Sequence, residues 1–251
     1  MRLTGALLEG RTALVTGAGG ERGLGRAVAR LLAAHGARVL VTDIDGEGAA
    51  RTAAELGEGH AGMAHDIASA EDCAAAVARA VELGGGLDVV VNSAGVTSPA
   101  RLLDIDEGER RRVIAINLEG TILMTQAAVP AMGESGSIVH ISSVAGQRGG
   151  GIFGGSHYAA AKAGVVGYAK AAARELAPRG IRVNAICPSY VETDITAGMS
   201  DEQRAAVVGA VPMGRGGTPD DVAGAALFLA SDLSAYVTGA TIDVNGGSHI
   251  H

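Results

Sequence analysis

Several residue types are scarce in this 251-residue chain. It has only two cysteines, Cys73 and Cys187, which are far apart in apolar surroundings and predict two buried free thiols rather than a disulfide or a redox pair. It has no tryptophan, and aromatic residues make up only 2% of the chain, so alanine, valine, leucine and isoleucine must fill its core.

Neither an excess of positive charge nor a long apolar run is present. The chain has 20 Lys and Arg against 27 Asp and Glu, and without a basic cluster we expect no nucleic-acid partner. No run of about eighteen uncharged apolar residues occurs, and residues 1–17 lack the apolar core of a signal peptide. These absences predict a soluble, cytoplasmic protein with no membrane partner.

What the chain does have is a regular alternation of strand-like and helix-like segments. Short β-branched apolar runs predict strands at 12–16, 37–43, 87–92, 136–142, 181–186 and 240–244, with a weaker one at 61–66. Alanine-rich segments with helical spacing lie at 23–35, 46–56, 69–83, 107–132, 156–177 and 219–230. The pattern predicts one α/β domain over residues 1–251, a Rossmann-type doubly wound parallel sheet of about seven strands with helices on both faces.

A glycine-rich stretch, VTGAGGERGLGRA (residues 15–27), separates the first strand from the first helix. Gly17, Gly23 and Leu24 lie where a backbone loop can cradle a pyrophosphate at a helix N-terminus. Asp43 ends the second predicted strand, where a carboxylate can accept hydrogen bonds from the hydroxyls of an adenosine ribose. This context predicts a dinucleotide site rather than a structural turn.

From this loop onward the chain resembles the short-chain dehydrogenase/reductase family, with two residues added to the family pattern Thr-Gly-x-x-x-Gly-x-Gly. The other matching segments, in the family's order, are Asp66-Ile67, NSAG (92–95), IN (116–117), ISSVAG (141–146), YAAAK (158–162), CPSYVET (187–193) and VTGATIDVNGG (237–247). Each motif is weak alone, but together and in order they are specific.

The resemblance implies a catalytic set of four residues. Tyr158 would be the general acid/base, and Lys162 would lower its pKa and bind the nicotinamide ribose. Ser143 would hydrogen-bond the substrate oxygen, with Ser142 as the competing serine. Asn117 would hold a water that links Lys162 to solvent. The structural alternatives are an amide that only kinks a helix for Asn117 and a strand-end cap for Ser143.

The resemblance also implies the cofactor contacts. These are Gly17, Gly23, Leu24, Asp43, Asp66, Ile67, Asn92, Ala94, Gly95, Tyr158, Lys162, Pro188, Val191 and Thr193. The chain departs from the family pattern at Ser93, at Ser189 and in a glycine-rich stretch before Tyr158 that is about two residues longer than usual. The substrate pocket is expected within residues 96–104, 147–157 and 190–215.

Two residues give opposite indications about the cofactor. Arg22 lies where NADPH-using relatives often carry an arginine for the 2′-phosphate, so NADP is possible through this residue. Asp43 lies where NAD-using relatives carry an acid, and a carboxylate repels a phosphate. We expect Arg22 to be solvated or paired with Glu21, and therefore a preference for NAD(H).

The leading hypothesis is an NAD(H)-dependent oxidoreductase that interconverts a small-molecule secondary alcohol and a ketone. The alternatives are an NADPH-dependent 3-oxoacyl thioester (acyl-carrier-protein) reductase and a non-catalytic dinucleotide-binding regulator. The small residues of helix 158–177 predict a homotetramer, a dimer of dimers, because the family pairs this helix between subunits. We expect no metal site, with His249 and His251 in a solvated tail.

Overall fold

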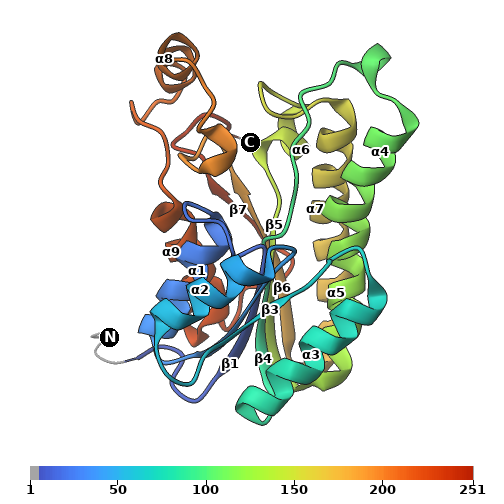
Figure 1. Ribbon diagram of the computed structural model, residues 1–251, viewed down its shortest axis with the longest axis vertical. Coiled ribbons are helices and arrows are strands. Elements are labelled where there is room, and N and C mark those ends of the chain that lie inside the picture. The colour runs from blue at the N-terminus through green and yellow to red at the C-terminus, as the bar shows by residue number, and fades with distance from the viewer. Residues whose placement is uncertain (1–5, 251) are drawn as a thin grey trace.

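The computed structural model describes residues 6–250 and contains one seven-stranded sheet (Figure 1). Its strands are β1 (Thr12–Thr16), β2 (Arg38–Asp43), β3 (Ala61–Ala64), β4 (Leu87–Asn92), β5 (Met132–Ile141), β6 (Ile181–Pro188) and β7 (Thr241–Val244). All pairings are parallel, in the order β3-β2-β1-β4-β5-β6-β7. The predicted doubly wound sheet is confirmed.

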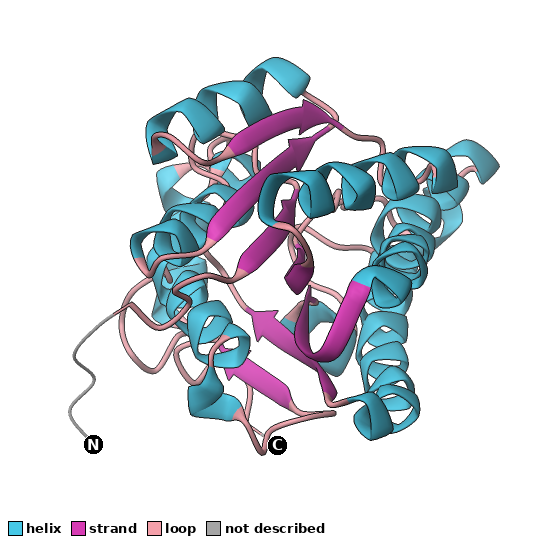
Figure 2. Ribbon diagram, turned by 90° about the horizontal axis from the view of Figure 1, so that it is seen from below, coloured by secondary structure: helices cyan, strands magenta, loops and turns pink. Residues whose placement is uncertain are grey.

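Helices cover both faces of the sheet (Figures 1 and 2). On one face lie α1 (Leu24–Ala34), α2 (Gly46–Leu56) and α9 (Pro219–Ala230). On the other lie α3 (Ala70–Gly84), α4 (Glu107–Ile114), α5 (Gly120–Ala128) and α7 (Ser156–Leu176). The short helices α6 (Val144–Arg148) and α8 (Asp201–Gly209) follow β5 and β6.

The core consists of two apolar layers, one on each face of the sheet. Neighbouring residues of β1 point in opposite directions, so Val15 packs in one layer and Leu14 in the other. Both are fully buried, as expected for strands covered on both sides. Cys73 and Cys187 are free and buried in this interior, as predicted.

The strand order reverses between β1 and β4. The chain proceeds from β1 toward β2 and β3, and from β4 toward β5, β6 and β7, so the loops that follow β1 and β4 diverge. Open α/β sheets bind ligands in the crevice at such a switch point, outside the carboxyl ends of the strands. The fold therefore places the glycine loop and the NSAG segment side by side.

The predicted helix 107–132 is helical without interruption over residues 107–131, but it is not a regular α-helix throughout. Between α4 and α5 the chain makes a π-helical turn, η2 (Ala115–Glu119), and a short 3₁₀ turn, η3 (Val129–Ala131), precedes β5. Asn117 lies in η2, and its amide donates to the carbonyls of Val113 and Val96, both at 2.9 Å. A side chain that binds a backbone carbonyl in this way replaces a regular helical bond.

By length and composition, Glu107–Ala131 is also the one stretch within residues 6–250 that could cross a membrane. In this fold it packs against α3 and α7, with Met124 buried. A core helix of a globular protein meets the same criteria.

Candidate active site

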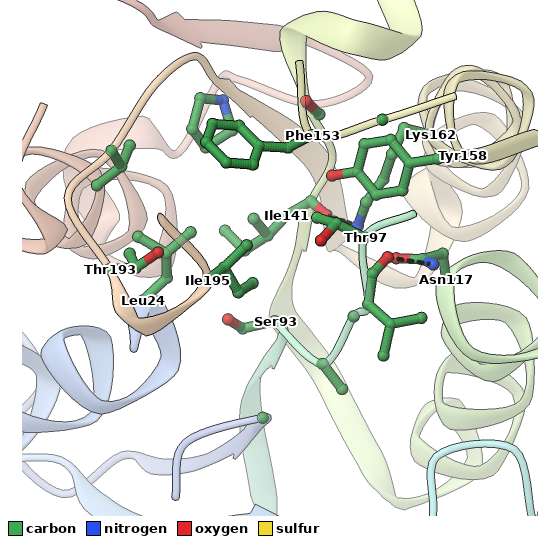
Figure 3. Close-up of a pocket in the computed structure, with 18 of the residues that line it drawn as sticks. Leu24, Ser93, Thr97, Asn117, Ile141, Phe153, Tyr158, Lys162, Thr193 and Ile195 are labelled. Carbon is green, nitrogen blue, oxygen red and sulfur yellow. Dashed lines mark hydrogen bonds between the residues drawn. The ribbon is translucent and has the colours of Figure 1, made fainter. Parts of the chain in front are cut away.

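A cavity of ≈ 650 Å³ opens at the carboxyl ends of the strands. Asp43 and Asp66 line it, as do Tyr158 and Phe153, which are labelled in Figure 3. The predicted site residues that line it are Gly17, Gly23, Leu24, Asp43, Asp66, Ile67, Ala94, Gly95, Asn117, Ser143, Tyr158, Lys162, Pro188, Val191 and Thr193. Asn92 is not among the lining residues.

Glycines allow the backbone segments under this cavity to approach one another. Gly17 has a φ of +65°, and a Cβ on it would lie 2.6 Å from the Cα of Ala94. A Cβ on Gly25 would collide with the carbonyl oxygen of Gly17. The first contact brings the glycine loop against the NSAG segment, and the second packs α1 closely against the end of β1.

The N-terminus of α1 has no side-chain cap. Its N-cap is Gly23, and the first turn carries no acidic residue. By contrast, α2, α3 and α4 are capped by the side chains of Asp45, Ser69 and Asp106. Gly23 and Leu24 line the cavity, so the free N–H groups and positive dipole end of α1 are available to an anion there. These residues fit a dinucleotide pyrophosphate.

Asp43 is held at the end of β2 by two backbone donors. Its carboxylate accepts from the N–H of Gly19 at 2.9 Å and from that of Asp45 at 3.0 Å. These bonds fix the side chain beside the glycine loop without neutralising its charge. A carboxylate in this position can accept ribose hydroxyls and repels a 2′-phosphate.

Arg22 is exposed to solvent, which is one of the two expected states, but its acidic partner is Asp194 rather than Glu21. Its Nε donates to Oδ1 of Asp194 at 3.2 Å, and its backbone N–H donates to Oδ2 of the same residue at 3.0 Å. The partner is 172 residues away in the chain and belongs to the short 3₁₀ helix η5 (Asp194–Thr196). Sequence spacing gives no signal for such a contact.

Ser143, Tyr158 and Lys162 all line the cavity, and Tyr158 and Lys162 lie side by side in Figure 3. Lys162 is buried, and its Nζ donates to the carbonyl of Ile141 at 2.9 Å. The same Nζ lies 5.8 Å from the centre of the Tyr158 ring. Burial lowers the pKa of Lys162 to about 8, because the ammonium has lost most of its contact with water.

The pKa of Tyr158 is raised, whereas we expected Lys162 to lower it. Burial is the main cause, because it disfavours the phenolate, and a hydrogen bond with Ser143 acts in the opposite direction. The Lys162 ammonium is directed to a backbone carbonyl instead of the phenol oxygen. Tyr158 is therefore a neutral phenol and a proton donor near neutral pH.

The two adjacent serines have different surroundings. The hydroxyl of Ser142 donates to the carbonyl of Lys162 at 2.7 Å and is buried, so it joins β5 to α7. The hydroxyl of Ser143 caps α6 by accepting from the N–H of Ala145, and it also bonds Tyr158. Ser143 thus combines the structural cap with contact to the phenol.

Asn117 presents an unused acceptor next to Lys162. Both hydrogens of its amide are bonded, but its Oδ1 is buried and has no partner among residues 6–250. A Cβ on Gly95 would lie 2.8 Å from this oxygen and 3.4 Å from the Nζ of Lys162. The bare backbone of Gly95 therefore leaves space between an acceptor and an ammonium, which suits a water molecule.

Asn92 lies behind the cavity. Its amide donates to Nδ1 of His140 at 3.0 Å and to the hydroxyl of Thr125 at 3.4 Å. His140 is fully buried against the ring of Tyr168, and burial lowers its pKa to about 3. The imidazole is thus a neutral acceptor that braces the end of β4.

This network predicts an acid-dependent loss of stability. His140 stays neutral in the folded protein but binds a proton below pH 6.5 when unfolded, so its contribution disappears as the pH falls from 6.5 toward 3. Between pH 7.5 and 5.0, the wild type should lose about 2 kcal/mol more unfolding free energy than His140→Asn. Urea unfolding at both pH values measures the difference, and equal losses would contradict the prediction.

Two departures from the family pattern are accommodated by the backbone. At Ser93 the loop is braced by backbone N–H groups, because Ser93 and Ala94 both donate to the hydroxyl of Thr16 at 3.1 Å. Ser189 does not have a positive φ, and its hydroxyl donates to the carbonyl of Asn245 at 3.1 Å. Neither position therefore needs the residue that the family usually has.

Each of the three segments expected to form the substrate pocket contributes to the cavity wall. Thr97 comes from the first, Phe153 from the second and Ile195 from the third (Figure 3). His65, which directly precedes Asp66, also lines the cavity and was not expected to do so. The weak strand was predicted to extend to residue 66, but β3 ends at Ala64, so His65 already lies beyond the strand. Among residues 6–250, no cluster of His, Cys, Asp and Glu side chains could hold a metal.

Known proteins match this chain over nearly its whole length. A family model described as Enoyl-(Acyl carrier protein) reductase matches residues 17–249. An uncharacterized short-chain type dehydrogenase/reductase, y4mP of Sinorhizobium fredii, is 48% identical, covering 98% of this chain and all of that protein. The chain belongs to the short-chain dehydrogenase/reductase family. It is an NAD(P)-dependent oxidoreductase that acts on CH–OH groups and their carbonyl counterparts.

Other similar members of this family have more specific names. The 3-oxoacyl-acyl-carrier-protein reductase FabG of Escherichia coli is 41% identical to this dehydrogenase/reductase, covering 96% of this chain and 98% of that protein. A solved structure named short-chain dehydrogenase/reductase SDR:Glucose/ribitol dehydrogenase, from Brucella melitensis, superimposes with a TM-score of 0.93 at 37% identity. It covers 99% of this chain and 100% of its own.

Proposed function

We propose that this dehydrogenase/reductase interconverts a secondary alcohol and a ketone with NAD(H) as cofactor. The observation that carries the cofactor choice is the carboxylate of Asp43, which two backbone N–H groups fix beside the glycine loop. It provides acceptors for the two hydroxyls of an unmodified ribose. Arg22, the residue that would favour a 2′-phosphate, is bonded to Asp194 instead.

Each part of the dinucleotide has a matching part of the cavity. The uncapped N-terminus of α1 would bind the pyrophosphate, Asp43 the adenosine ribose, and Asp66 and Ile67 the adenine. Tyr158 and Lys162 would bind the nicotinamide ribose, beside Ala94, Gly95, Pro188, Val191 and Thr193 in the cavity wall. Bound there, the nicotinamide supplies or accepts the hydride.

The residues of this chain supply the proton. Tyr158 is a neutral phenol that can donate its proton to a carbonyl oxygen, and Ser143 beside it can hold that oxygen by a hydrogen bond. Lys162 and the unpartnered Oδ1 of Asn117 flank a space for a water that would return the proton from solvent. The reverse order of these steps removes the proton from an alcohol.

The substrate end of the cavity is mainly apolar. Val144, Phe153 and Ile195 are among the apolar residues of its wall. Such walls favour a substrate whose carbonyl or hydroxyl group is flanked by hydrocarbon.

A second candidate activity is reduction of 3-oxoacyl thioesters with NADPH. The identity of 41% to FabG proteins along nearly the full chain favours it. The fixed carboxylate of Asp43 disfavours it, because it would stand against the 2′-phosphate of NADPH. We also infer a cytoplasmic enzyme, by similarity to these relatives.

Kinetics with both cofactors test the proposal. Wild-type kcat/KM should be higher with NADH than with NADPH across a panel of ketones, and higher with NAD than with NADP across secondary alcohols. A 3-oxoacyl thioester reduced fastest, and with NADPH, would replace the proposal by the second candidate. An absence of turnover on every compound, with dinucleotide binding retained, would favour a non-catalytic binding protein.

The proposal includes assembly as a homotetramer. The outward face of α7 carries small residues such as Ala160, Ala163 and Gly167, and Leu103 and Tyr236 are almost fully exposed elsewhere on the surface. Apolar groups on several faces are buried when subunits associate about two-fold axes. Size-exclusion chromatography with light scattering should give four times the chain mass of 24.9 kDa, and a monomer at micromolar concentration would contradict the assembly.

A further inference from the structure

The contact between Arg22 and Asp194 joins two parts of the cavity wall. Arg22 belongs to the lengthened part of the glycine loop, and Asp194 belongs to η5, within the segment that forms the substrate side of the cavity. Gly20, Gly23 and Asp194 all line the cavity. The ion pair therefore lies at the dinucleotide site rather than on a remote surface.

Asp194 binds both the backbone and the side chain of Arg22. One carboxylate oxygen accepts from the backbone N–H at 3.0 Å and the other accepts from Nε at 3.2 Å. The carboxylate also rests on the loop, since a Cβ on Gly20 would be 3.3 Å from it. The backbone N–H of Arg22 holds the pKa of Asp194 below its usual range, so the residue is charged at neutral pH.

The position of Asp194 is itself fixed. It is the first residue of η5, whose start is closed by a reciprocal pair of bonds between Thr193 and Thr196. The hydroxyl of Thr196 also donates to the carbonyl of Val191 at 3.1 Å. The acceptor for Arg22 is thus held in place by its own segment, independently of the glycine loop.

Arg22 is close in the chain to the group that would contact the adenosine ribose. Gly19, three residues earlier, donates its N–H to Asp43, and the chain turns back between Gly20 and Gly23, whose backbone groups are bonded at 3.3 Å. A long flexible side chain on this turn has the reach to approach the same ribose. In the structure the guanidinium is directed to Asp194 instead.

We propose that Asp194 is a determinant of cofactor specificity, because it holds Arg22 away from the place where a 2′-phosphate would bind. Asp43 disfavours that phosphate directly by charge repulsion. Asp194 acts indirectly, by pairing with Arg22, the cation of the glycine loop. The inference rests on the proposed preference for NAD(H) and adds a second residue to its cause. The expected effect is on binding at the adenosine ribose, although Asp194 itself belongs to the segment 190–215 that is expected to form part of the substrate pocket.

Binding measurements with the intact protein test the inference without relying on turnover. Dissociation constants are determined for NADPH and NADH, and for adenosine 2′,5′-bisphosphate and 5′-AMP as probes of the ribose end. In Asp194→Ala the preference for the 2′-phosphorylated member of each pair should rise about 5- to 10-fold. This is the size of effect expected when a guanidinium that is no longer paired with a carboxylate binds a phosphate at a partly exposed site. In Arg22→Ala/Asp194→Ala the increase should be lost.

Glu21→Ala is the matched control. Glu21 is an exposed acid next to Arg22, so its removal changes the net charge of the loop by the same amount without releasing Arg22. An equal increase in Glu21→Ala and Asp194→Ala, or an increase that persists in the double variant, would overturn the inference. A wild type that already prefers NADPH, and loses this preference in Arg22→Ala, would instead overturn the proposed cofactor.

Discussion

Tyr158→Phe should lower kcat by at least about 10²-fold, and by up to about 10⁴-fold, while the affinity for NADH falls far less, because Lys162 and the rest of the proposed cofactor site are retained. The phenylalanine ring fills the space of the phenol, which is half-buried and packs closely on Gly154. The variant lacks only the hydroxyl, so no proton can pass to the carbonyl oxygen. Steady-state kinetics and a fluorescence titration with NADH measure the two effects separately.

Tyr168→Phe provides the control for this variant. Tyr168 belongs to the same helix, α7, but contacts His140 in the core and does not line the cavity. Loss of the Tyr168 hydroxyl should lower the free energy of unfolding more than it lowers kcat. If Tyr158→Phe retained near-normal kcat, the proton donor would be another group and the role of Tyr158 would be refuted.

Asp43→Ser should move the cofactor preference toward NADP(H) by about 10²-fold, measured as the ratio of kcat/KM for the two cofactors. Hydrogen bonds to a charged group contribute about 1.5–3 kcal/mol, so loss of the carboxylate weakens NAD(H) binding by roughly 10- to 100-fold. The same change removes the repulsion of a 2′-phosphate. Both effects alter the ratio in the same direction.

Two further variants separate charge from shape at this position. Asp43→Asn keeps an oxygen that can accept from Gly19 but removes the charge, so it should show a smaller shift in the same direction. Glu47→Ser removes an exposed acid from the nearby helix α2 and should leave the ratio unchanged. An unchanged ratio in Asp43→Ser would show that this carboxylate does not select the cofactor.

The order of strands and helices followed from the sequence because local patterns encode it. Runs such as 12–16 and 87–92 have a continuous apolar centre, since both faces of these strands are covered. The helix α8 was missed although Ser200 and Gln203 form a capping box at its start. Its residues are mostly exposed, so it lacks the apolar periodicity on which the other predictions relied.

The features of the site that depend on distant contacts could not be read from the chain. The amide of Asn117, in the π-helical turn, donates to Val96, in a loop 21 residues earlier. The partner of Arg22 is in η5, and the bond from Lys162 to the carbonyl of Ile141 crosses from α7 to β5. Each of these contacts sets the direction of a side chain, and sequence spacing does not encode it.

The glycine-rich segment 149–154 has a consequence for how substrate range can change. Gly151 and Gly154 pair with each other, and a side chain on Gly154 would displace the ring of Tyr158. Gly149 and Gly150 have φ values of +89° and +96°, which other residues rarely adopt. Within this segment, substitutions that leave Tyr158 in place are therefore expected at Ile152 and Phe153. A laboratory search for new substrates should randomise these two positions and leave the surrounding glycines intact.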